Sequence, residues 1–244
     1  MDLVKFQNIK KSFGKKEVLK DISFGIESGE ICGLIGMSGC GKTTLFNILM
    51  GIVSKDEGEI FFKNEQIKGN LNKIRKEWGF ATQNNMIFDE LSVKENCQYF
   101  GSLYGLKRKN IVERMNELLN LFKLAEFENE LIRNLSGGMK KRANLLISLI
   151  HSPSLLILDE PTVGLDLVLR NILWSYIKDI NKIGTTILIS SHLTDEIEQN
   201  CSNVLIIKNG RIIANATPKE YLSKYPKYKN LGGVFEMLMK NEDI

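Results

Sequence analysis

Continuous apolar runs, each close to glycine or another turn-forming residue, mark the central strands expected in this chain. Residues 30–35, which are largely apolar after Glu30, are expected to form such a strand between Gly29 and Gly36, and residues 155–158 are apolar at every position. A strand is also expected at residues 186–190, which are apolar at the three central positions. Runs of this kind are typical of strands buried on both faces of a parallel sheet. We therefore predict three strands at the centre of an α/β fold.

Other segments have the spacing of helices or of exposed sheet. Helical spacing is predicted at residues 43–50, with Gly51 as the stop, and at residues 139–150. Residues 204–208 and 211–214 flank Asn209-Gly210, a pair typical of a two-residue hairpin turn. Strands are also expected near residues 3–9, 22–26 and 59–63. Residues 112–122 are expected to form an amphipathic helix whose buried face is Val112, Met115, Leu118, Leu119 and Phe122.

These elements predict one domain over residues 1–244. Within it we expect a core and β lobe from residues 1–87 and 151–216. A helical subdomain is expected over 88–150, and a short helical tail over 217–244. A chain of 244 residues is long enough to bury the core of one large α/β domain.

Composition limits the classes of function. Hydrophobic residues make up 43% and charged residues 25% of the chain, and no apolar run approaches the roughly 18 residues of a membrane span. The N-terminus does not resemble a signal peptide, and four scattered cysteines fit a reduced cytoplasm. A net charge of +4 from 33 basic and 29 acidic residues gives no reason to expect nucleic acid. Lys107–Lys109 and Lys140–Arg142 are expected to be solvated helix ends.

A phosphate-binding loop is predicted between the first central strand and the helix at 43–50. The pattern is glycine, four residues, then Gly-Lys-Thr, and its strand–loop–helix setting makes an ordinary glycine-rich surface loop improbable. Glycines let backbone amides approach phosphate oxygens, Lys42 would reach the β- and γ-phosphates, and the Thr43 hydroxyl would bind Mg²⁺. The residues expected to contact the nucleotide here are Gly36, Met37, Ser38, Gly39, Cys40, Gly41, Lys42, Thr43 and Thr44.

A second acidic element follows the strand at 155–158. Asp159 and Glu160 come directly after the apolar run, and Pro161 ends it. Carboxylates at the C-terminal end of a parallel strand lie at the edge where open α/β sheets bind ligands. Asp159 is the candidate Mg²⁺ ligand and Glu160 the candidate general base for an attacking water. Alone, the pair could equally be solvated loop carboxylates.

The ordered motif set resembles that of the ATP-binding subunits of ATP-binding cassette (ABC) transporters over nearly the whole chain. This resemblance implies a RecA-like P-loop NTPase core, an N-terminal antiparallel β lobe and an α-helical signature subdomain. It also implies further site residues. These are Phe13 stacking on adenine, Gln83 coupling the γ-phosphate and metal site to the helical subdomain, Ser136–Gly138 as the signature, Asp166 communicating between opposed sites, and His192 contacting the γ-phosphate.

The signature residues allow two interpretations. Ser136 could simply cap the helix that follows, or Ser136, Gly137 and Gly138 could bind the γ-phosphate of ATP held by a second subunit. The resemblance implies the second arrangement, with two ATP molecules at one interface of a homodimer or heterodimer. Position 139 is Met where the family usually has Gln, so no amide side chain can hydrogen-bond the opposing nucleotide there.

The segment Phe88–Asn96 and the following Tyr99–Leu106 resemble the type-2 exporter branch of this family. That branch implies integral membrane permease partners and a peripheral place on the cytoplasmic face of the cell membrane. Apolar residues in the segment could line a groove for the permease or belong to the helical core, with similar weight on each interpretation. They are Met86, Ile87, Phe88 and Tyr99.

Three functions remain open at this stage. The first is an ATP-hydrolysing subunit that powers export through a separate permease. The second is a soluble ABC-type ATPase acting as a clamp or assembly factor. The third is a nucleotide-gated module without hydrolysis, which is disfavoured because Lys42, Asp159, Glu160 and His192 are all present. The transported substrate is not encoded in these motifs.

Overall fold

The computed structural model describes residues 2–67, 74, 76–82 and 86–240. The chain divides into two compact units. The first combines Met1–Leu71 with Thr186–Ile244, and the second is Asn72–Thr185. None of the helices in the described ranges combines the length and apolar character required to cross a membrane.

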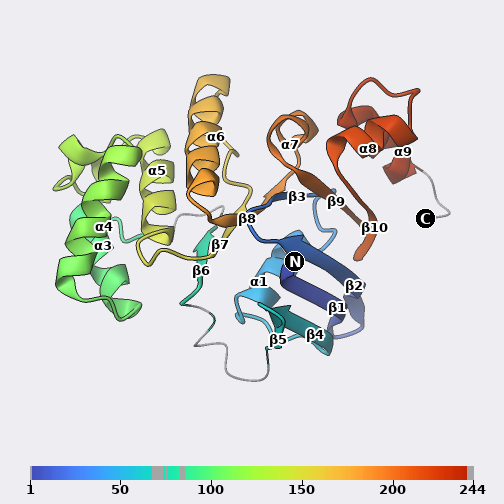
Figure 1. Cartoon of the computed structure of the whole chain (residues 1–244), viewed down its shortest axis with the longest axis horizontal. Helices are drawn as coiled ribbons and strands as arrows, with labels where there is room; N and C mark the ends of the chain where they lie inside the picture. Colours follow the sequence, from blue (N-terminus) through green and yellow to red (C-terminus); the bar gives the residue numbers. More distant parts are fainter. Residues whose placement is uncertain (1, 68–73, 75, 83–85, 241–244) are drawn as a thin grey trace. The chain divides into compact units, whose positions relative to one another are not determined.

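An antiparallel sheet forms the N-terminal part of the first unit (Figure 1). Its strand order is β2-β1-β4-β5, and inward-facing positions such as Val4, Phe6 and Ile9 of β1 are fully or almost fully buried. The predicted strands of the β lobe are therefore confirmed, and the first two extend further than the sequence indicated. The strands are β1 (Asp2–Phe13), β2 (Lys16–Glu27), β4 (Glu57–Phe62) and β5 (Glu65–Gln66).

The first unit also contains parallel strands with one antiparallel addition. β3 pairs in parallel with both β8 and β9. Every residue of β3 is buried, as the sequence predicted, and every residue of β8 is buried as well. β9 and β10 form the predicted hairpin, with Asn209 and Gly210 at φ 48° and 79°. The strands are β3 (Ile31–Ile35), β8 (Thr186–Ser191), β9 (Asn203–Lys208) and β10 (Arg211–Ala216).

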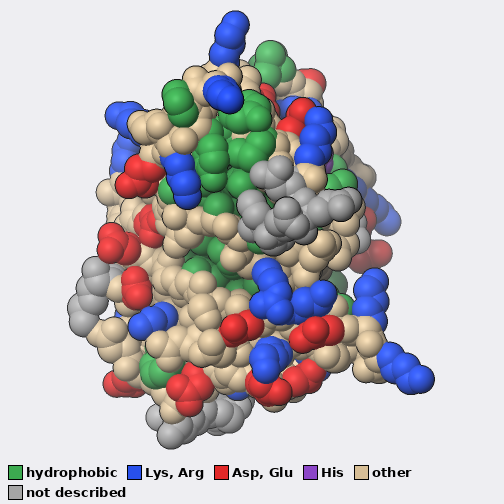
Figure 2. All heavy atoms as spheres, turned by 90° about the vertical axis from the view of Figure 1, so that its right-hand side faces the viewer, with side chains coloured by type: hydrophobic (Ala, Val, Ile, Leu, Met, Phe, Trp, Pro, Cys, Tyr) green, Lys and Arg blue, Asp and Glu red, His purple; other side chains and the backbone are tan. Residues whose placement is uncertain are grey.

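The described residues of this unit include four helices: α1 (Lys42–Leu49), α7 (Thr194–Asn200), α8 (Pro218–Lys224) and α9 (Leu231–Lys240). α8 starts with a capping box, and α9 packs against α7 and α8. Figure 2 shows the side of the molecule that carries α8 and α9, where apolar side chains gather between basic ones.

The second unit joins two parallel strands to the helical region (Figure 1). α3 packs against both α4 and α5, and short 3₁₀ turns connect the helices at Ala125–Phe127 and Ile132–Asn134. The elements are β6 (Trp78–Ala81), α3 (Val93–Leu103), α4 (Arg108–Leu121), α5 (Gly137–Ser148), β7 (Leu155–Asp159) and α6 (Leu167–Lys182).

The buried face of α4 differs from the prediction at one position. Val112 is 37% exposed, whereas Ile111 is 2% exposed and begins the buried stripe that continues through Met115 and Leu118. Residues 111, 115 and 118 are spaced by four and three, so their side chains share one side of a helix, and residue 112 lies about 100° away. The prediction that Val112 faces the core is therefore wrong.

The basic run Lys140–Arg142 is not a solvated helix end. α5 begins at Gly137, earlier than predicted, so these residues lie inside the helix. The Arg142 guanidinium donates to the Phe122 carbonyl oxygen at 3.0 Å, just beyond the C-terminus of α4. A cation at this place satisfies a terminal carbonyl and opposes the negative end of the helix dipole. Burial lowers the pKa of neighbouring Lys141.

Candidate functional site

The phosphate-loop pattern forms the predicted strand–loop–helix unit. β3 ends at Ile35 and α1 begins at Lys42, with Gly41 at φ 114° as the residue before the helix. A Cβ at Gly36 would lie 2.6 Å from the Ile207 carbonyl oxygen, so only glycine fits against β9 there. Gly41 has no side chain to cap α1, and therefore the amides at this helix end face the loop interior without a side-chain acceptor from the capping residue.

Lys42 brings positive charge into the loop. Its ammonium donates to the Gly36 carbonyl oxygen at 2.8 Å and to the Met37 carbonyl oxygen at 3.3 Å, and the residue is only 6% exposed. A buried ammonium held against the carbonyl oxygens of the loop adds positive charge where an anion would bind. Together with the start of α1, this arrangement suits the phosphates of a nucleotide.

Two further predicted residues lie in the same unit. Phe13 is the last residue of β1, is 51% exposed and precedes Gly14, whose φ of 59° turns the chain into β2. His192 is exposed and directly follows β8. The ring face of Phe13 and the imidazole of His192 are thus presented at the surface by the ends of strands.

The acidic pair belongs to the second unit. Asp159 is the last residue of β7 and is 6% exposed. Glu160 follows at φ 49°, in the left-handed region that residues with a Cβ adopt at a cost. Such backbone conformations are concentrated at functional sites. The strain turns the chain sharply at the position proposed for the general base.

The signature residues start α5. The Ser136 hydroxyl accepts a hydrogen bond from the Met139 amide at 3.3 Å, so the helix-cap interpretation describes this chain by itself. A Cβ at Gly138 would lie 3.1 Å from Leu169 Cδ1, which places the start of α5 against the start of α6. Asp166 caps α6 by accepting from the Leu169 amide at 2.9 Å. The signature and Asp166 therefore lie close together.

One residue near Asp166 was not singled out from the sequence. The Arg170 guanidinium donates to the Leu165 carbonyl oxygen at 2.8 Å and so fixes the turn that leads to Asp166. The available signal was the spacing: a residue four positions after a helix cap lies on the first turn of that helix, within reach of the chain that enters it.

The proposed metal ligands come from different parts of the chain. Thr43 offers a hydroxyl and Asp159 a carboxylate, oxygen donors of the kind that Mg²⁺ prefers. Gln83, the third expected ligand, lies outside the described residues. The described residues contain no cluster of three or more His, Cys, Asp and Glu side chains suited to hold a metal. This chemistry fits Mg²⁺ held jointly with nucleotide phosphates rather than a metal site made by protein alone.

An exposed apolar cluster lies at the start of the helical region. Met86 is 57%, Phe88 42% and Tyr99 46% exposed, and the rings of Phe88 and Tyr99 meet edge to face at 4.9 Å. Ile87 is half-buried. The three exposed side chains do not belong to the helical core. Exposed apolar residues gathered in this way are typical of a contact surface for another protein.

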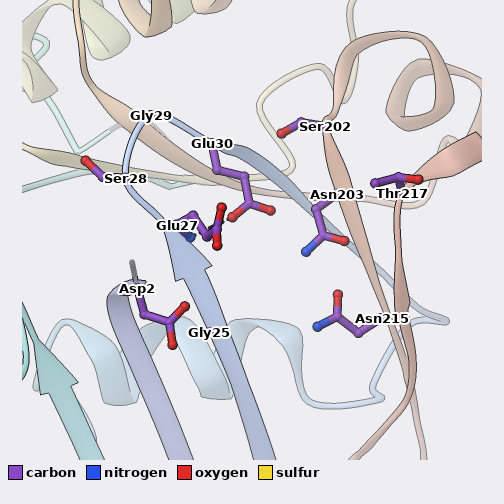
Figure 3. A pocket seen from close by; sticks show the side chains of 10 residues that line it. All are labelled: Asp2, Gly25, Glu27, Ser28, Gly29, Glu30, Ser202, Asn203, Asn215 and Thr217. Carbon is purple, nitrogen blue, oxygen red and sulfur yellow. Dashed lines mark hydrogen bonds between the residues drawn. The ribbon is translucent and has the colours of Figure 1, made fainter.

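A hollow of about 560 Å³ elsewhere in the first unit has a different chemistry (Figure 3). Asp2, Glu27 and Glu30 line it, with no basic residue in its described lining. Burial raises the pKa of Glu30, helped by the nearby charges of Glu27 and Asp2. A site with this charge repels a nucleotide triphosphate. The phosphate loop is therefore the candidate nucleotide site, and this hollow is not.

Comparisons with known proteins agree with this geometry. The ABC transporter family matches residues 19–163. The linearmycin resistance ATP-binding protein LnrL of Bacillus subtilis (strain 168) is 36% identical over 222 residues, covering 91% of this chain and 71% of the relative. The Nod factor export ATP-binding protein I of Ralstonia nicotianae is 34% identical, covering 91% and 69%.

A solved structure of the ATP-binding subunit of an ABC transporter gives a TM-score of 0.88 at 25% identity, covering 98% of this chain and all of that one. This likeness confirms the predicted fold class: a P-loop NTPase core, an antiparallel β lobe and a helical subdomain. ATP-binding subunits of this kind dimerise and work with membrane permeases. From its motifs, its fold and the family match, the chain is an ATP-hydrolysing member of the ABC transporter family.

Proposed function

We propose that this chain hydrolyses ATP to power the export of a substrate through a separate membrane permease. The observation that carries the proposal is that one chain contains both features: a phosphate loop built from glycines around buried Lys42, and a second, exposed helix start at Ser136. The named relatives, one linked to linearmycin resistance and another to Nod factor export, support an outward direction of transport.

ATP binding is assigned to the first unit's motifs. The adenine ring stacks on Phe13, and the triphosphate lies within the loop Gly36–Thr44, where backbone amides and the Lys42 ammonium balance its charge. The Thr43 hydroxyl, Asp159 and Gln83 would hold Mg²⁺, which neutralises charge on the β- and γ-phosphates when bound. ATP is thereby fixed with its γ-phosphate open to attack by water.

Hydrolysis is assigned to Glu160 with support from His192 and Gln83. The Glu160 carboxylate accepts a proton from the attacking water as its oxygen approaches the γ-phosphorus. His192 and Gln83 orient the water and the γ-phosphate, and Lys42 stabilises the negative charge that develops on the phosphate oxygens. These roles match the residues to the chemistry of phosphoryl transfer to water.

A second ATP-binding subunit is proposed to complete each site. The Ser136 hydroxyl and the amides of Gly137 and Gly138 of one chain would bind the γ-phosphate of ATP held by the other. Asp166, next to the start of α5, would lie at the same interface. ATP binding closes the dimer and hydrolysis reopens it, which transmits force to the permease.

The membrane partner is proposed to contact the exposed apolar cluster of Met86, Phe88 and Tyr99. This contact would place the protein on the cytoplasmic face of the membrane as a peripheral subunit. The permease selects the substrate, since the transport path lies outside this chain. Detergent-dependent co-purification of an integral membrane protein would support this arrangement, and its loss in a Phe88→Glu variant would locate the contact.

The experiment that tests the proposed function uses Glu160→Gln. Turnover is expected to fall about 100- to 10,000-fold because the general base is lost, while ATP binding persists. Light scattering should then show an ATP-dependent shift from monomer to dimer. A wild-type rate in this variant would refute the base assignment. A protein that binds ATP yet stays monomeric would mean that a different ATP-binding subunit supplies the other half.

A further inference from the structure

The proposed adenine platform lies at the tip of a hairpin, where the sheet alone does not fix a side chain. Phe13 ends β1, and the turn at Gly14 follows directly. Phe13 is 51% exposed, so few neighbours limit the rotation of its ring. A stacking surface binds best when its orientation is set before the ligand arrives. The contacts that hold Phe13 are therefore relevant to nucleotide affinity.

Asp56 makes hydrogen bonds to β1 just beyond the point where the pairing of β1 with β4 ends. The ladder ends with Lys10 opposite Glu57. Beyond that pair, the Asp56 amide donates to the Lys10 carbonyl oxygen at 3.0 Å, and the Asp56 carboxylate accepts from the Ser12 amide at 2.6 Å. The side chain thus replaces a strand neighbour and fixes the backbone one residue before Phe13.

Lys11 connects this carboxylate to the ring. Its ammonium lies 2.7 Å from Asp56 Oδ1 and 5.3 Å from the centroid of Phe13. The Lys11 side chain is 13% exposed, so it is held far more closely than a typical surface lysine. The Lys11 ammonium, and after it the Ser12 amide, keeps the pKa of Asp56 below its usual range. One cation therefore makes an ion pair and a cation–π contact together.

We propose that Lys11 and Asp56 are positioning residues for base recognition: they hold the Phe13 ring with one face against an ammonium and the other face available to a purine. This proposal rests on the proposed role of Phe13 as the adenine platform. Lys11 and Asp56 are expected to strengthen binding of the base of the nucleotide and to have no effect on binding of its phosphates. Lys11 is thus a second determinant of nucleotide affinity outside the phosphate loop.

The test compares ATP with inorganic triphosphate, which lacks the base, by titration calorimetry. Lys11→Met keeps the length of the side chain and removes its charge. Its affinity for ATP should fall about fivefold, the scale of one cation–π contact, while its affinity for triphosphate stays unchanged. Lys10→Met is the matched control, because Lys10 makes an ion pair of the same length, 2.7 Å, with Glu57 on the same two strands. This control should bind ATP like the wild type.

A double-mutant cycle separates positioning from a structural effect. Phe13→Leu should weaken ATP binding about tenfold, and adding Lys11→Met should weaken it no further. Lys11→Arg should restore binding, since a guanidinium also pairs with a carboxylate and stacks on a ring. A Phe13→Trp variant should lose ATP-dependent quenching of its emission when Lys11→Met is added.

Several results would overturn the proposal. Equal losses for ATP and triphosphate would show that Lys11 acts on the phosphates or on the fold of the loop. The same loss in the Phe13→Leu background would show that it does not act through the ring. Failure of the proposed function is distinct: the wild-type chain would then bind neither ATP nor triphosphate, or would bind ATP equally well with Leu at position 13.

Discussion

Two helix starts in this protein, both proposed to bind phosphate, are capped in different ways. α1 begins after Gly41, which is in a left-handed conformation and makes no side-chain cap. α5 begins after Ser136, whose hydroxyl caps the helix from within the chain. The start of α1 therefore has no side-chain cap, whereas the start of α5 is capped by a residue of its own chain. We therefore interpret the start of α1 as a ligand site and the start of α5 as a helix end that is capped without a ligand.

The glycines beside these helices show the same contrast. A Cβ at Gly36 or Gly41 would lie 2.6 Å from the chain's own atoms, from Ile207 in one case and Leu19 in the other. A Cβ at Gly137 would meet none of the described atoms within 4 Å. Internal packing thus explains Gly36 and Gly41, but it does not explain Gly137. A close approach from outside, as proposed for the opposing nucleotide, would explain it.

Lys42→Ala tests the start of α1 and should have the largest effect on ATP binding. The variant loses the ammonium that bridges the Gly36 and Met37 carbonyl oxygens and that would face the triphosphate. We expect ATP affinity to fall at least about a hundredfold, because a buried charged partner is removed from an anion. Titration calorimetry measures this directly. Lys16→Ala, at an exposed position of β2, is the control and should bind normally. Retained affinity in Lys42→Ala would refute the phosphate-loop assignment.

His151 lies just after α5 and makes the stability of the fold sensitive to pH. His151 Nε2 donates to the Trp78 carbonyl oxygen at 2.9 Å, its ring stacks on Tyr104, and its Nδ1 is buried with no hydrogen-bond partner in the described structure. Burial lowers the pKa of His151 to about 4. The folded state thus resists protonation that the unfolded state accepts near pH 6.5.

The contribution of neutral His151 to the free energy of unfolding should therefore be fully present above about pH 6.5 and should decline as the pH falls toward 4. Between pH 7 and pH 5 we expect His151 to account for a loss of about 2 kcal/mol in the free energy of unfolding. Urea unfolding at the two pH values measures it. A His151→Gln variant should lose less stability over this interval. An equal loss in both proteins would assign the acid sensitivity to other groups.

Ser136→Ala tests the start of α5 by removing its side-chain cap. The Met139 amide loses its acceptor, so the free energy of unfolding should fall by about 1 kcal/mol. ATP affinity of the monomer should remain unchanged because this helix start is complete without ATP. Ser136→Thr keeps a hydroxyl and should restore most of the stability. Urea unfolding with and without ATP tests both points, and a loss of monomer affinity for ATP would contradict them.

Local patterns in the sequence predicted the parts of the fold that depend on local chemistry. The strand before Gly36, the Asn209-Gly210 hairpin and the buried strand ending at Asp159 each have a signal within a few residues. The error at Val112 is also local in origin. Apolar residues at 111 and 112 both fit a helical period, and only packing against the rest of the unit decides which one is buried.

Features that depend on distant residues were not predictable from the sequence. Asp56 reaches Ser12 and Lys11 only because β1 and β4 pair, across a separation of 44 and 45 residues. The contact made by Arg142 also depends on a distant residue, because its acceptor, the Phe122 carbonyl oxygen, lies at the end of a different helix. The roles of the phosphate-loop, signature and acidic residues rest on motif resemblance and stay proposals. The geometry adds their burial and conformation.

The left-handed backbone at Glu160 has a consequence for engineering this protein toward heat resistance. A residue with a Cβ at φ 49° costs of order 1 kcal/mol that glycine would avoid. A search for stabilising substitutions would therefore favour Glu160→Gly, which should raise the melting temperature and remove the proposed base in one step. Selection for thermal stability alone would therefore favour a variant without the proposed base, so the screen must also measure ATP turnover.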